Sequence, residues 1–251
     1  MIVPLWKPIG VSTHSFVKAY GDQIQNKITH TGSLDPMAEG VVVALTAEDR
    51  FLKEKYTNTE KEYKFEILVG VSTDSHDLLG LITDYETNHL STEEITDKIN
   101  IVLSKLTGRI NQVIPDFSAK RINGESYYDL AKRGDVLPKV TEPVTFHSLG
   151  ILDLVPKDKN EIFQQIQIKI NLVQGEFHQN EILQRWEQYF NDELNNETEL
   201  VIIKLSAVTS KRTYMRGLVR DLSNILNISM LVYSLIRTKN GNYSKVDCNC
   251  K

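Results

Sequence analysis

The chain has 251 residues, and its 29 Lys and Arg against 33 Asp and Glu give a formal net charge of −4. This balance excludes a globally basic nucleic-acid-binding protein, and 41% hydrophobic with 25% charged residues excludes a disordered or repetitive chain. Apolar runs such as GVVVA, which begins at Gly40, are far shorter than the roughly 18 residues that a membrane helix requires. The N-terminus, MIVPLWKPIG, does not resemble a signal peptide. We therefore expect a cytoplasmic, soluble protein. A monomer is also expected, although none of these features bears on the oligomeric state.

The first half of the chain contains patterns for two helices and a strand. We expect a helix from about His14 to Gln25. Glu62–Gly70 places apolar side chains at alternate positions, which predicts a half-buried strand. Ser91 stands three residues before Glu94 and opens an apolar run at helical spacing that Gly108 closes, which predicts a capped helix.

The second half mixes both periods. Gln165–Ile170 (QIQIKI) and Glu199–Leu205 alternate apolar and polar residues and are predicted as strands. A short helix is expected around Glu181–Phe190, followed by a polar surface loop over Asn191–Glu199. An apolar stripe predicts a further helix over Tyr214–Leu226. This irregular order favours an α+β fold with a mixed sheet.

The chain shows no internal repeat and no linker rich in Pro, Gly or Ser. We therefore expect a single domain over residues 1–251. The two cysteines, Cys248 and Cys250, lie next to the C-terminus with one residue between them and without a partner cluster. This arrangement favours neither a zinc site nor a structural disulfide, so no metal is expected.

One segment indicates chemistry: HTGSLDPMAEG, which runs from His30 to Gly40. Its Gly, Ser, Asp and Pro residues predict a loop, and Asp35 is biased to an extended backbone because Pro36 follows it. A loop would present the carboxylate of Asp35 to a ligand, as catalytic loops often do. The alternative is that Asp35 only caps a turn, which is a common role for Asp.

The whole string closely resembles the catalytic-aspartate motif of the TruB family of pseudouridine synthases. Four further segments resemble family motifs in the same order along nearly the whole chain. They are KPxGxxS from Lys7; KxY at Lys61–Tyr63 with Gly70, Thr73, Asp74, Ser75, Asp77 and Gly80; QxPPxxSAxKxxGxxxYxxAxxG from Gln112 to Gly134; and TYMRGL from Thr213 with Asp221 and the terminal LIRT from Leu235.

The sequence also departs from the family pattern. Thr29 and Arg212 stand where the family usually has glycine. The stretch near 174–199 is longer than expected between two strands, which indicates an insertion. Because 13 residues follow Thr238, we expect no C-terminal PUA domain, a small RNA-binding module.

The resemblance implies a pseudouridine synthase fold, with a mixed, mostly antiparallel sheet, flanking helices and a central RNA-binding cleft. It also implies isomerisation of uridine 55 in the T-loop of tRNA, with the tRNA T-arm as partner. The reaction breaks the N1–C1′ bond of uridine and rejoins the base through C5. One carboxylate is sufficient for it in principle, so no cofactor or metal is expected.

Three residues match the catalytic positions of the family. Asp35 would act as the nucleophile at C1′ or C6 or as a base at C2′, and the sequence leaves these routes open. Tyr63 would stack on the flipped uracil, although its phase in the strand also fits a core tyrosine. Arg216 would hold the carboxylate through two parallel hydrogen bonds.

Other residues are expected to bind the substrate. His30 matches the family histidine that fills the space left by the flipped base, and Tyr214 and Leu235 are expected to line the pocket. Lys7, in the KPxGxxS element, is a further candidate. A local basic stretch that includes Lys120 and Arg121 would contact phosphates, since neutralising phosphates supplies most non-specific affinity for RNA. The candidate substrate-binding residues are therefore His30, Tyr214, Leu235, Lys7, Lys120 and Arg121.

Two other functions fit parts of the pattern. A non-catalytic RNA-binding or tRNA-folding protein could keep the fold, but binding alone does not require the combination of Asp35, Tyr63 and Arg216. A guide-RNA-dependent synthase of the archaeal and eukaryotic type is disfavoured by the expected lack of the C-terminal domain.

Overall fold

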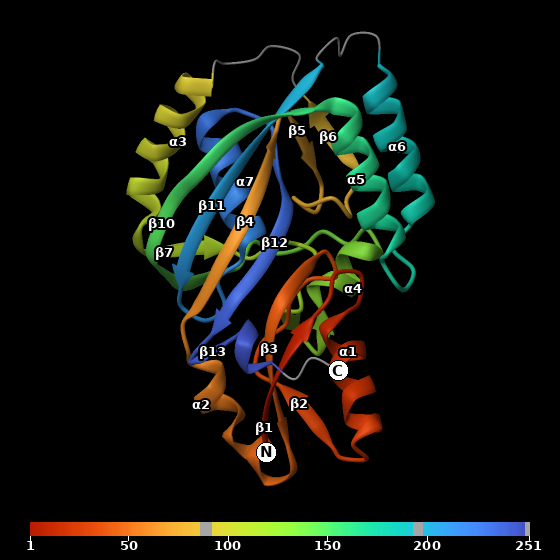
Figure 1. The fold of residues 1–251 in the computed structure, drawn as a ribbon, viewed down its shortest axis with the longest axis vertical. Coiled ribbons are helices and arrows are strands. Elements are labelled where there is room, and N and C mark those ends of the chain that lie inside the picture. The colour runs from red at the N-terminus through yellow and green to blue at the C-terminus, as the bar shows by residue number, and fades with distance from the viewer. Residues whose placement is uncertain (86–91, 193–197, 249–251) are drawn as a thin grey trace.

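A computed structural model of the protein describes residues 1–85, 92–192 and 198–248 (Figure 1). Three sequence predictions concern residues outside these ranges. They are the helix cap at Ser91, the role of Cys250 and the greater part of the polar loop after Asn191.

The described residues form thirteen β-strands and seven α-helices, with short 3-10 helices at Ala47–Leu52 and Lys245–Asp247. The strands are β1 (Ile2–Lys7), β2 (Ile28–His30), β3 (Ala38–Thr46), β4 (Lys61–Val69), β5 (Val71–Thr73), β6 (Ile82–Tyr85), β7 (Gly108–Val113), β8 (Arg121–Ile122), β9 (Glu125–Ser126), β10 (Thr141–Asp158), β11 (Glu199–Thr209), β12 (Met230–Asn240) and β13 (Tyr243–Ser244). The helices are α1 (Thr13–Gln23), α2 (Lys53–Thr57), α3 (Thr92–Leu106), α4 (Tyr127–Lys132), α5 (Lys159–Asn171), α6 (Gln179–Asn191) and α7 (Met215–Leu226).

The central sheet has nine strands and is mostly antiparallel, which confirms the predicted fold class. Its strands follow the order β1-β3-β12-β4-β11-β10-β7, with β2 paired to β3 and β13 paired to β12. Among the described strands of this sheet, only β3 and β12 pair in parallel, and there Leu235 lies opposite Ala38. This contact places a strand from the end of the chain beside the segment that follows Asp35.

Both faces of the sheet are buried at its centre. On β4, Ile67 faces one apolar core and the next residue, Leu68, faces the other. Ile203 and Ile202 on β11 divide in the same way, because successive side chains of a strand point to opposite faces. Helices α3 and α7 complete the first core, and α5 and α6, which lie side by side, complete the second (Figure 1).

The predicted strand over Gln165–Ile170 is wrong, because these residues belong to α5. Ile162, Ile166 and Ile170 are spaced by four residues and are fully buried, so they form one face of a helix. Ile168, which completed the apparent alternation, is 54% exposed. A window of six residues cannot distinguish the strand period of two from the helical period of about 3.6, because Ile162, the first residue of the buried helical face, lies before the window.

The other predicted elements are confirmed, with ends shifted by a few residues. The hydroxyl of Ser12 accepts the N–H of Ser15 and so begins α1. Gly108, with a φ of +107°, follows the end of α3. In the part of the chain that the structure describes, the helices are too short or too polar to cross a membrane.

Helices α5 and α6 form a hairpin between two paired strands. Asp158 at the end of β10 lies opposite Glu199 at the start of β11, so the chain leaves the sheet and returns at neighbouring positions. The side chain of Asp158 caps α5 by accepting the N–H groups of Asn160 and Glu161. Helix α6 occupies the stretch near 174–199 that the sequence marked as unusually long.

Candidate active site

The loop between β2 and β3 carries Asp35 and is held on both sides of it. The hydroxyl of Thr13, at the start of α1, donates to the carbonyl oxygen of Leu34 and accepts its N–H, both at 2.8 Å. The N–H of Gly10 donates to the carbonyl oxygen of Pro36 at 2.8 Å. The position of Asp35 therefore depends on contacts with segments that precede it in the chain.

Arg237 on β12 fastens the same loop from the sheet. Its buried guanidinium donates to the carbonyl oxygens of Gly32 and Ser33, both at 3.2 Å, and to that of Val41 at 2.7 Å. Gly40 is required at the end of the motif, because a Cβ there would lie 2.3 Å from the carbonyl oxygen of Arg237 and the φ of Gly40 is +126°. The last segment of the chain thus positions the loop that carries the carboxylate.

Asp35 and Arg216 form a bidentate ion pair, as the sequence predicts. Nε of Arg216 donates to Oδ2 of Asp35 at 2.8 Å, and Nη2 donates to Oδ1 at 3.0 Å. The side chain of Arg216 is 3% exposed, whereas that of Asp35 is 33% exposed. The pair therefore buries its cation and leaves the carboxylate accessible from outside.

A second carboxylate, Asp77, lies beside the same guanidinium, with its Oδ2 3.6 Å from Nε of Arg216. Burial raises the pKa of Asp77, although the positive charge of Arg216 acts in the opposite direction. Burial alone would lower the pKa of Arg216, but the negative charges of Asp35 and Asp77 prevail and raise it above its usual range. Arg216 further donates to the carbonyl oxygens of Ser75 at 3.1 Å and Phe117 at 2.8 Å. These contacts leave the guanidinium a single orientation.

The side chain of Gln112 sets where α7 begins. Its amide donates to the carbonyl oxygen of Tyr214 at 3.0 Å and accepts the N–H of Tyr214 at 2.9 Å. Gly217 packs against the same amide, since a Cβ there would lie 3.0 Å from it. These contacts fix the position at which α7 begins, and Arg216 lies in its first turn.

Asp35 opens into a pocket with a volume of about 370 Å³. Tyr63 from β4 and Leu235 from β12 are both 8% exposed and line this pocket, together with Tyr214. Burial and then the charge of Asp35 raise the pKa of the Tyr214 hydroxyl. The structure therefore brings Asp35, Tyr63, Tyr214 and Leu235 together, which their separation along the chain could not show.

Basic side chains line the same pocket. Lys120 and Arg121 come from the segment before α4, and Lys211 and Arg212 come from the turn before α7. Lys120 forms an ion pair with Glu142, and Arg212 lies 3.5 Å from the same carboxylate. The negatively charged protein thus has a local basic surface beside Asp35.

Lys7 and His30 lie outside this pocket. Lys7 is fully buried, and its ammonium donates to the carbonyl oxygens of Pro8 at 2.9 Å and Ala38 at 2.7 Å. Burial lowers the pKa of Lys7 to about 8, against the effect of the Asp35 charge. Lys7 thus supports the start of β3, and the structure does not expose it to a ligand.

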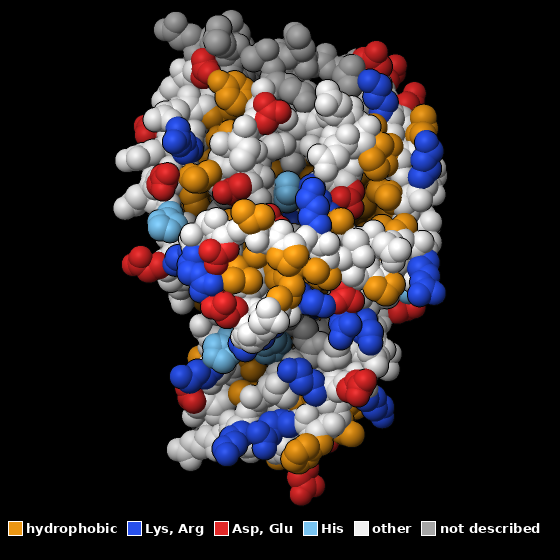
Figure 2. Space-filling view, turned by 180° about the vertical axis from the view of Figure 1, so that it is seen from behind, with side chains coloured by type: hydrophobic (Ala, Val, Ile, Leu, Met, Phe, Trp, Pro, Cys, Tyr) orange, Lys and Arg blue, Asp and Glu red, His pale blue; other side chains and the backbone are white. Residues whose placement is uncertain are grey.

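His30 faces a neighbouring hollow between α1, β2 and the segment before α2. Lys18, Lys27, Arg50 and Lys53 also line this hollow. Burial and then the charge of Lys53 lower the pKa of His30 to about 4, so the imidazole is neutral near pH 7. Figure 2 shows that Lys and Arg side chains are frequent in the lower part of the back face, whereas acidic and basic side chains alternate above it.

Sequence reasoning assigned no role to three residues that build this site. They are Asp77, Gln112 and Arg237, and all three lie in the family motifs. Each contacts a partner more than 100 positions away in the chain, and the partners of Gln112 and Arg237 are main-chain groups. Each is a polar residue that the structure buries. A polar residue inside a motif was the available signal. The described residues contain no group of three or more His, Cys, Asp or Glu side chains that could hold a metal ion.

Comparison with known proteins identifies the family. A sequence model described as "TruB family pseudouridylate synthase (N terminal domain)" matches residues 21–177. The tRNA pseudouridine synthase B of Phocaeicola vulgatus is 30% identical over 223 residues, which cover 88% of this chain and 74% of that protein. The tRNA pseudouridine synthase B of Listeria innocua is 29% identical over 251 residues, which cover 98% of this chain and 68% of that protein. The chain belongs to the TruB family.

A solved structure supports the fold of this TruB family member. A chain in "Crystal Structure of a Cbf5-Nop10-Gar1 Complex" superimposes with a TM-score of 0.58 and 14% sequence identity, over 97% of this chain and 50% of that one. The backbone also shows why glycine suits the position of Arg212 in the TruB pattern. Arg212 has a φ of +64°, which is in the left-handed region that glycine adopts most easily.

Proposed function

We propose that this protein converts uridine 55 in the T-loop of tRNA to pseudouridine. The observation that carries the proposal is the accessible carboxylate of Asp35, which a buried Arg216 holds bidentately beside Tyr63 and Leu235 in a TruB family chain. Relatives named tRNA pseudouridine synthase B support tRNA as the substrate.

The reaction needs no net change of atoms or charge. The N1–C1′ bond breaks, the base turns, and a C5–C1′ bond forms; the proton on C5 leaves and N1 gains one. Asp35 would attack C1′ or C6, or remove a proton from C2′, and the geometry is compatible with each route. Arg216 would keep the carboxylate oriented throughout, because its four hydrogen bonds hold it to three segments of the chain.

The target base must leave the stack of the RNA loop, which costs a few kcal/mol. Tyr63 would replace the lost stacking, and Leu235 would form an apolar wall of the pocket. Tyr214 would face the same base, since it lines the pocket beside Asp35. The pocket geometry and the family motifs support these three roles, whereas the proposed role of His30 in filling the vacated space is supported by the family motif alone.

Phosphate contacts would come from the basic side chains at the pocket, Lys120 and Arg121 among them. Lys7 would act as a positioning residue through its bond to Ala38. We also propose that residues 1–251 act as one catalytic domain and as a monomer. The pairing of β12 with both β3 and β4 in one sheet supports a single domain.

The test is modification of a tRNA transcript and of its isolated T-arm stem-loop. We expect pseudouridine at position 55 in both, with kcat/KM values within about tenfold of each other, because the proposed contacts surround the target base. Site-specific mapping of pseudouridine and steady-state kinetics measure this. Tight RNA binding without product would instead support the non-catalytic RNA-binding alternative. A stem-loop that reacts hundreds of times more slowly would show that contacts outside the T-arm are needed.

Replacement of Tyr63 should separate stacking from chemistry. Tyr63→Leu should bind the stem-loop but lower kcat by about 10²-fold or more, because the pocket loses its aromatic surface while phosphate contacts remain. Tyr63→Phe keeps the ring, so near-normal turnover would assign Tyr63 to stacking alone. Fluorescence anisotropy and single-turnover kinetics measure the two steps. A large loss of affinity with normal turnover of bound RNA would contradict the stacking role of Tyr63.

A further inference from the structure

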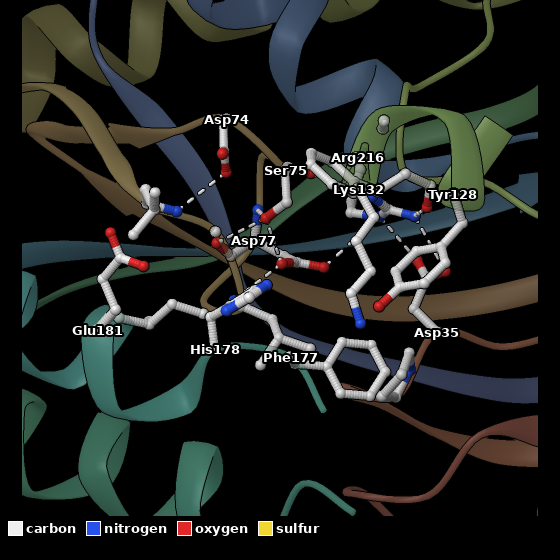
Figure 3. A pocket seen from close by; sticks show the side chains of 17 residues that line it. Asp35, Asp74, Ser75, Asp77, Tyr128, Lys132, Phe177, His178, Glu181 and Arg216 are labelled. Carbon is white, nitrogen blue, oxygen red and sulfur yellow. Dashed lines mark hydrogen bonds and ion pairs between the residues drawn. The ribbon is translucent and has the colours of Figure 1, made fainter. Parts of the chain in front are cut away.

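A second pocket adjoins the first at Asp35 and has a volume of about 230 Å³. Arg216, Asp77 and Phe117 form part of its wall. Other lining residues come from the turn before β6, from α4 and from the N-terminal end of α6 (Figure 3). The reaction described above places the uracil against Tyr63 and Leu235 in the first pocket and leaves this second pocket without an occupant.

Three aromatic rings line the second pocket in a row. The ring centroids of Phe117 and Tyr128 are 6.2 Å apart, and those of Tyr128 and Phe177 are 5.7 Å apart. Figure 3 shows the side chains of Tyr128, Lys132 and Phe177 next to one another at the pocket. Leu79, Leu81 and Ile182 add apolar surface. The pocket thus offers aromatic side chains together with the cationic side chain of Lys132 beside them.

Phe177 reaches the pocket through the connection between α5 and α6. The N–H of Gln174 donates to the carbonyl oxygen of Gly10 at 2.7 Å, and Gly10 in turn holds Pro36 beside the candidate catalytic Asp35. Gly175 has a φ of +100°, and a Cβ there would approach the ring of Phe177 to 3.3 Å. This tight turn therefore orients Phe177 relative to the Asp35 loop.

A hydrogen bond also joins the connection between α5 and α6 to α4. Nζ of Lys132 donates to the carbonyl oxygen of Glu176 at 3.1 Å, and the N–H of Phe177 donates to Oε1 of Gln179 at 3.0 Å. The helical hairpin of residues 159–191 thus contacts Gly10, which holds the loop that carries Asp35, and supplies Phe177 to the aromatic row. It contributes a wall to the site in addition to covering the sheet.

The lining selects a small planar ligand with a polar edge. The volume is below the about 300–1,000 Å³ typical of pockets for drug-sized molecules. Aromatic faces bind nucleobases by stacking, and the carboxylates of Asp74 and Glu181 could accept hydrogen bonds from amino or imino groups. Because Asp35 borders both pockets, an occupant would lie next to the reacting nucleotide.

We propose that the second pocket binds the base of a nucleotide adjacent to the target uridine and that Phe177 is the residue on which this base stacks. The inference rests on the proposed function, because it assumes that a uridine occupies the first pocket. The α5–α6 hairpin would then contribute directly to RNA recognition.

The test compares the wild-type protein with Phe177→Ala and its control variants on three RNAs. The RNAs are the T-arm stem-loop and two copies that carry an abasic residue on the 5′ or the 3′ side of the target uridine. Phe177→Ala should lower kcat/KM on the intact stem-loop about 5- to 150-fold, the range that corresponds to about 1–3 kcal/mol of base stacking. On one of the two abasic RNAs the same substitution should have less than a twofold effect. That RNA lacks the base that stacks on Phe177, so removing the ring costs no further contact.

Phe163→Ala is the matched control. Phe163 lies on the same hairpin, but its ring packs against Phe190 with a centroid distance of 4.7 Å and does not line the pocket. It should show the same small effect on all three RNAs. Phe177→Leu should lower kcat/KM as Phe177→Ala does, because its side chain is apolar but has no ring. Phe177→Trp keeps an aromatic ring and should retain activity close to that of the wild type. Melting temperatures identify any variant that fails to fold.

Equal losses of Phe177→Ala on all three RNAs would overturn the proposal in favour of a purely structural role. Normal activity of Phe177→Ala on the intact stem-loop would also overturn it. Measuring the same cycle as Kd by fluorescence anisotropy separates this inference from the proposed function. A wild-type protein that forms no pseudouridine would defeat the proposed function, whereas base-dependent Kd changes at Phe177 would still identify the subsite.

Discussion

Asp35→Asn should abolish pseudouridine formation, with kcat lowered at least about 10³-fold, because the amide has nearly the same shape but is neither nucleophilic nor basic. The fold should survive the change. Arg216 would keep its bonds to the carbonyl oxygens of Ser75 and Phe117 and its neighbour Asp77, so its buried charge would not be left alone. Site-specific mapping of pseudouridine after single-turnover reactions measures the loss.

RNA affinity is the control for Asp35→Asn. Asp35 is one of many residues that line the pocket. Kd for the stem-loop should therefore stay within a few-fold of the wild-type value in fluorescence anisotropy. A melting temperature close to that of the wild type would confirm that the pocket remains assembled. Turnover within tenfold of wild type would exclude Asp35 as the catalytic group.

Arg216→Lys should also be severely impaired, with kcat lowered about 10²-fold or more although the charge is kept. The guanidinium donates two parallel hydrogen bonds to Asp35 and two more to Ser75 and Phe117, a planar arrangement that a single ammonium cannot reproduce. The melting temperature should fall as well, because buried carbonyl groups lose their donors. Single-turnover kinetics and thermal unfolding measure the two effects.

Arg220→Lys is the matched control on the same helix. Arg220 lies one turn after Arg216, forms an ion pair with Asp221 at 2.8 Å and donates to the carbonyl oxygen of Val113 at 3.0 Å. It does not line the pocket beside Asp35, so its replacement should leave kcat within about threefold of wild type. Activity of Arg216→Lys equal to that of wild type would mean that bidentate geometry is not required.

The short-range patterns of the sequence predicted most elements because their signals are local. The alternation in β4 and the apolar stripe of α7 each arise from side chains that share one face over several turns or residues. The same locality explains the error at α5. The isoleucines at 166, 168 and 170 satisfy a period of two, and only packing against β10, β11 and α6 shows which of them is buried.

By itself, the sequence determined the family, the loop that presents Asp35 and the identity of its partner Arg216, because motifs preserve residue types at fixed spacing. The tertiary structure decided what surrounds that pair. Asp77 shares the guanidinium from a separate turn, Arg237 holds the Asp35 loop from β12, and Lys7 proves to be buried. The α5–α6 hairpin brings Phe177 to a second pocket beside Asp35. These arrangements depend on strand pairing between distant segments and on the burial of charge, and neither is encoded at any single position of the chain.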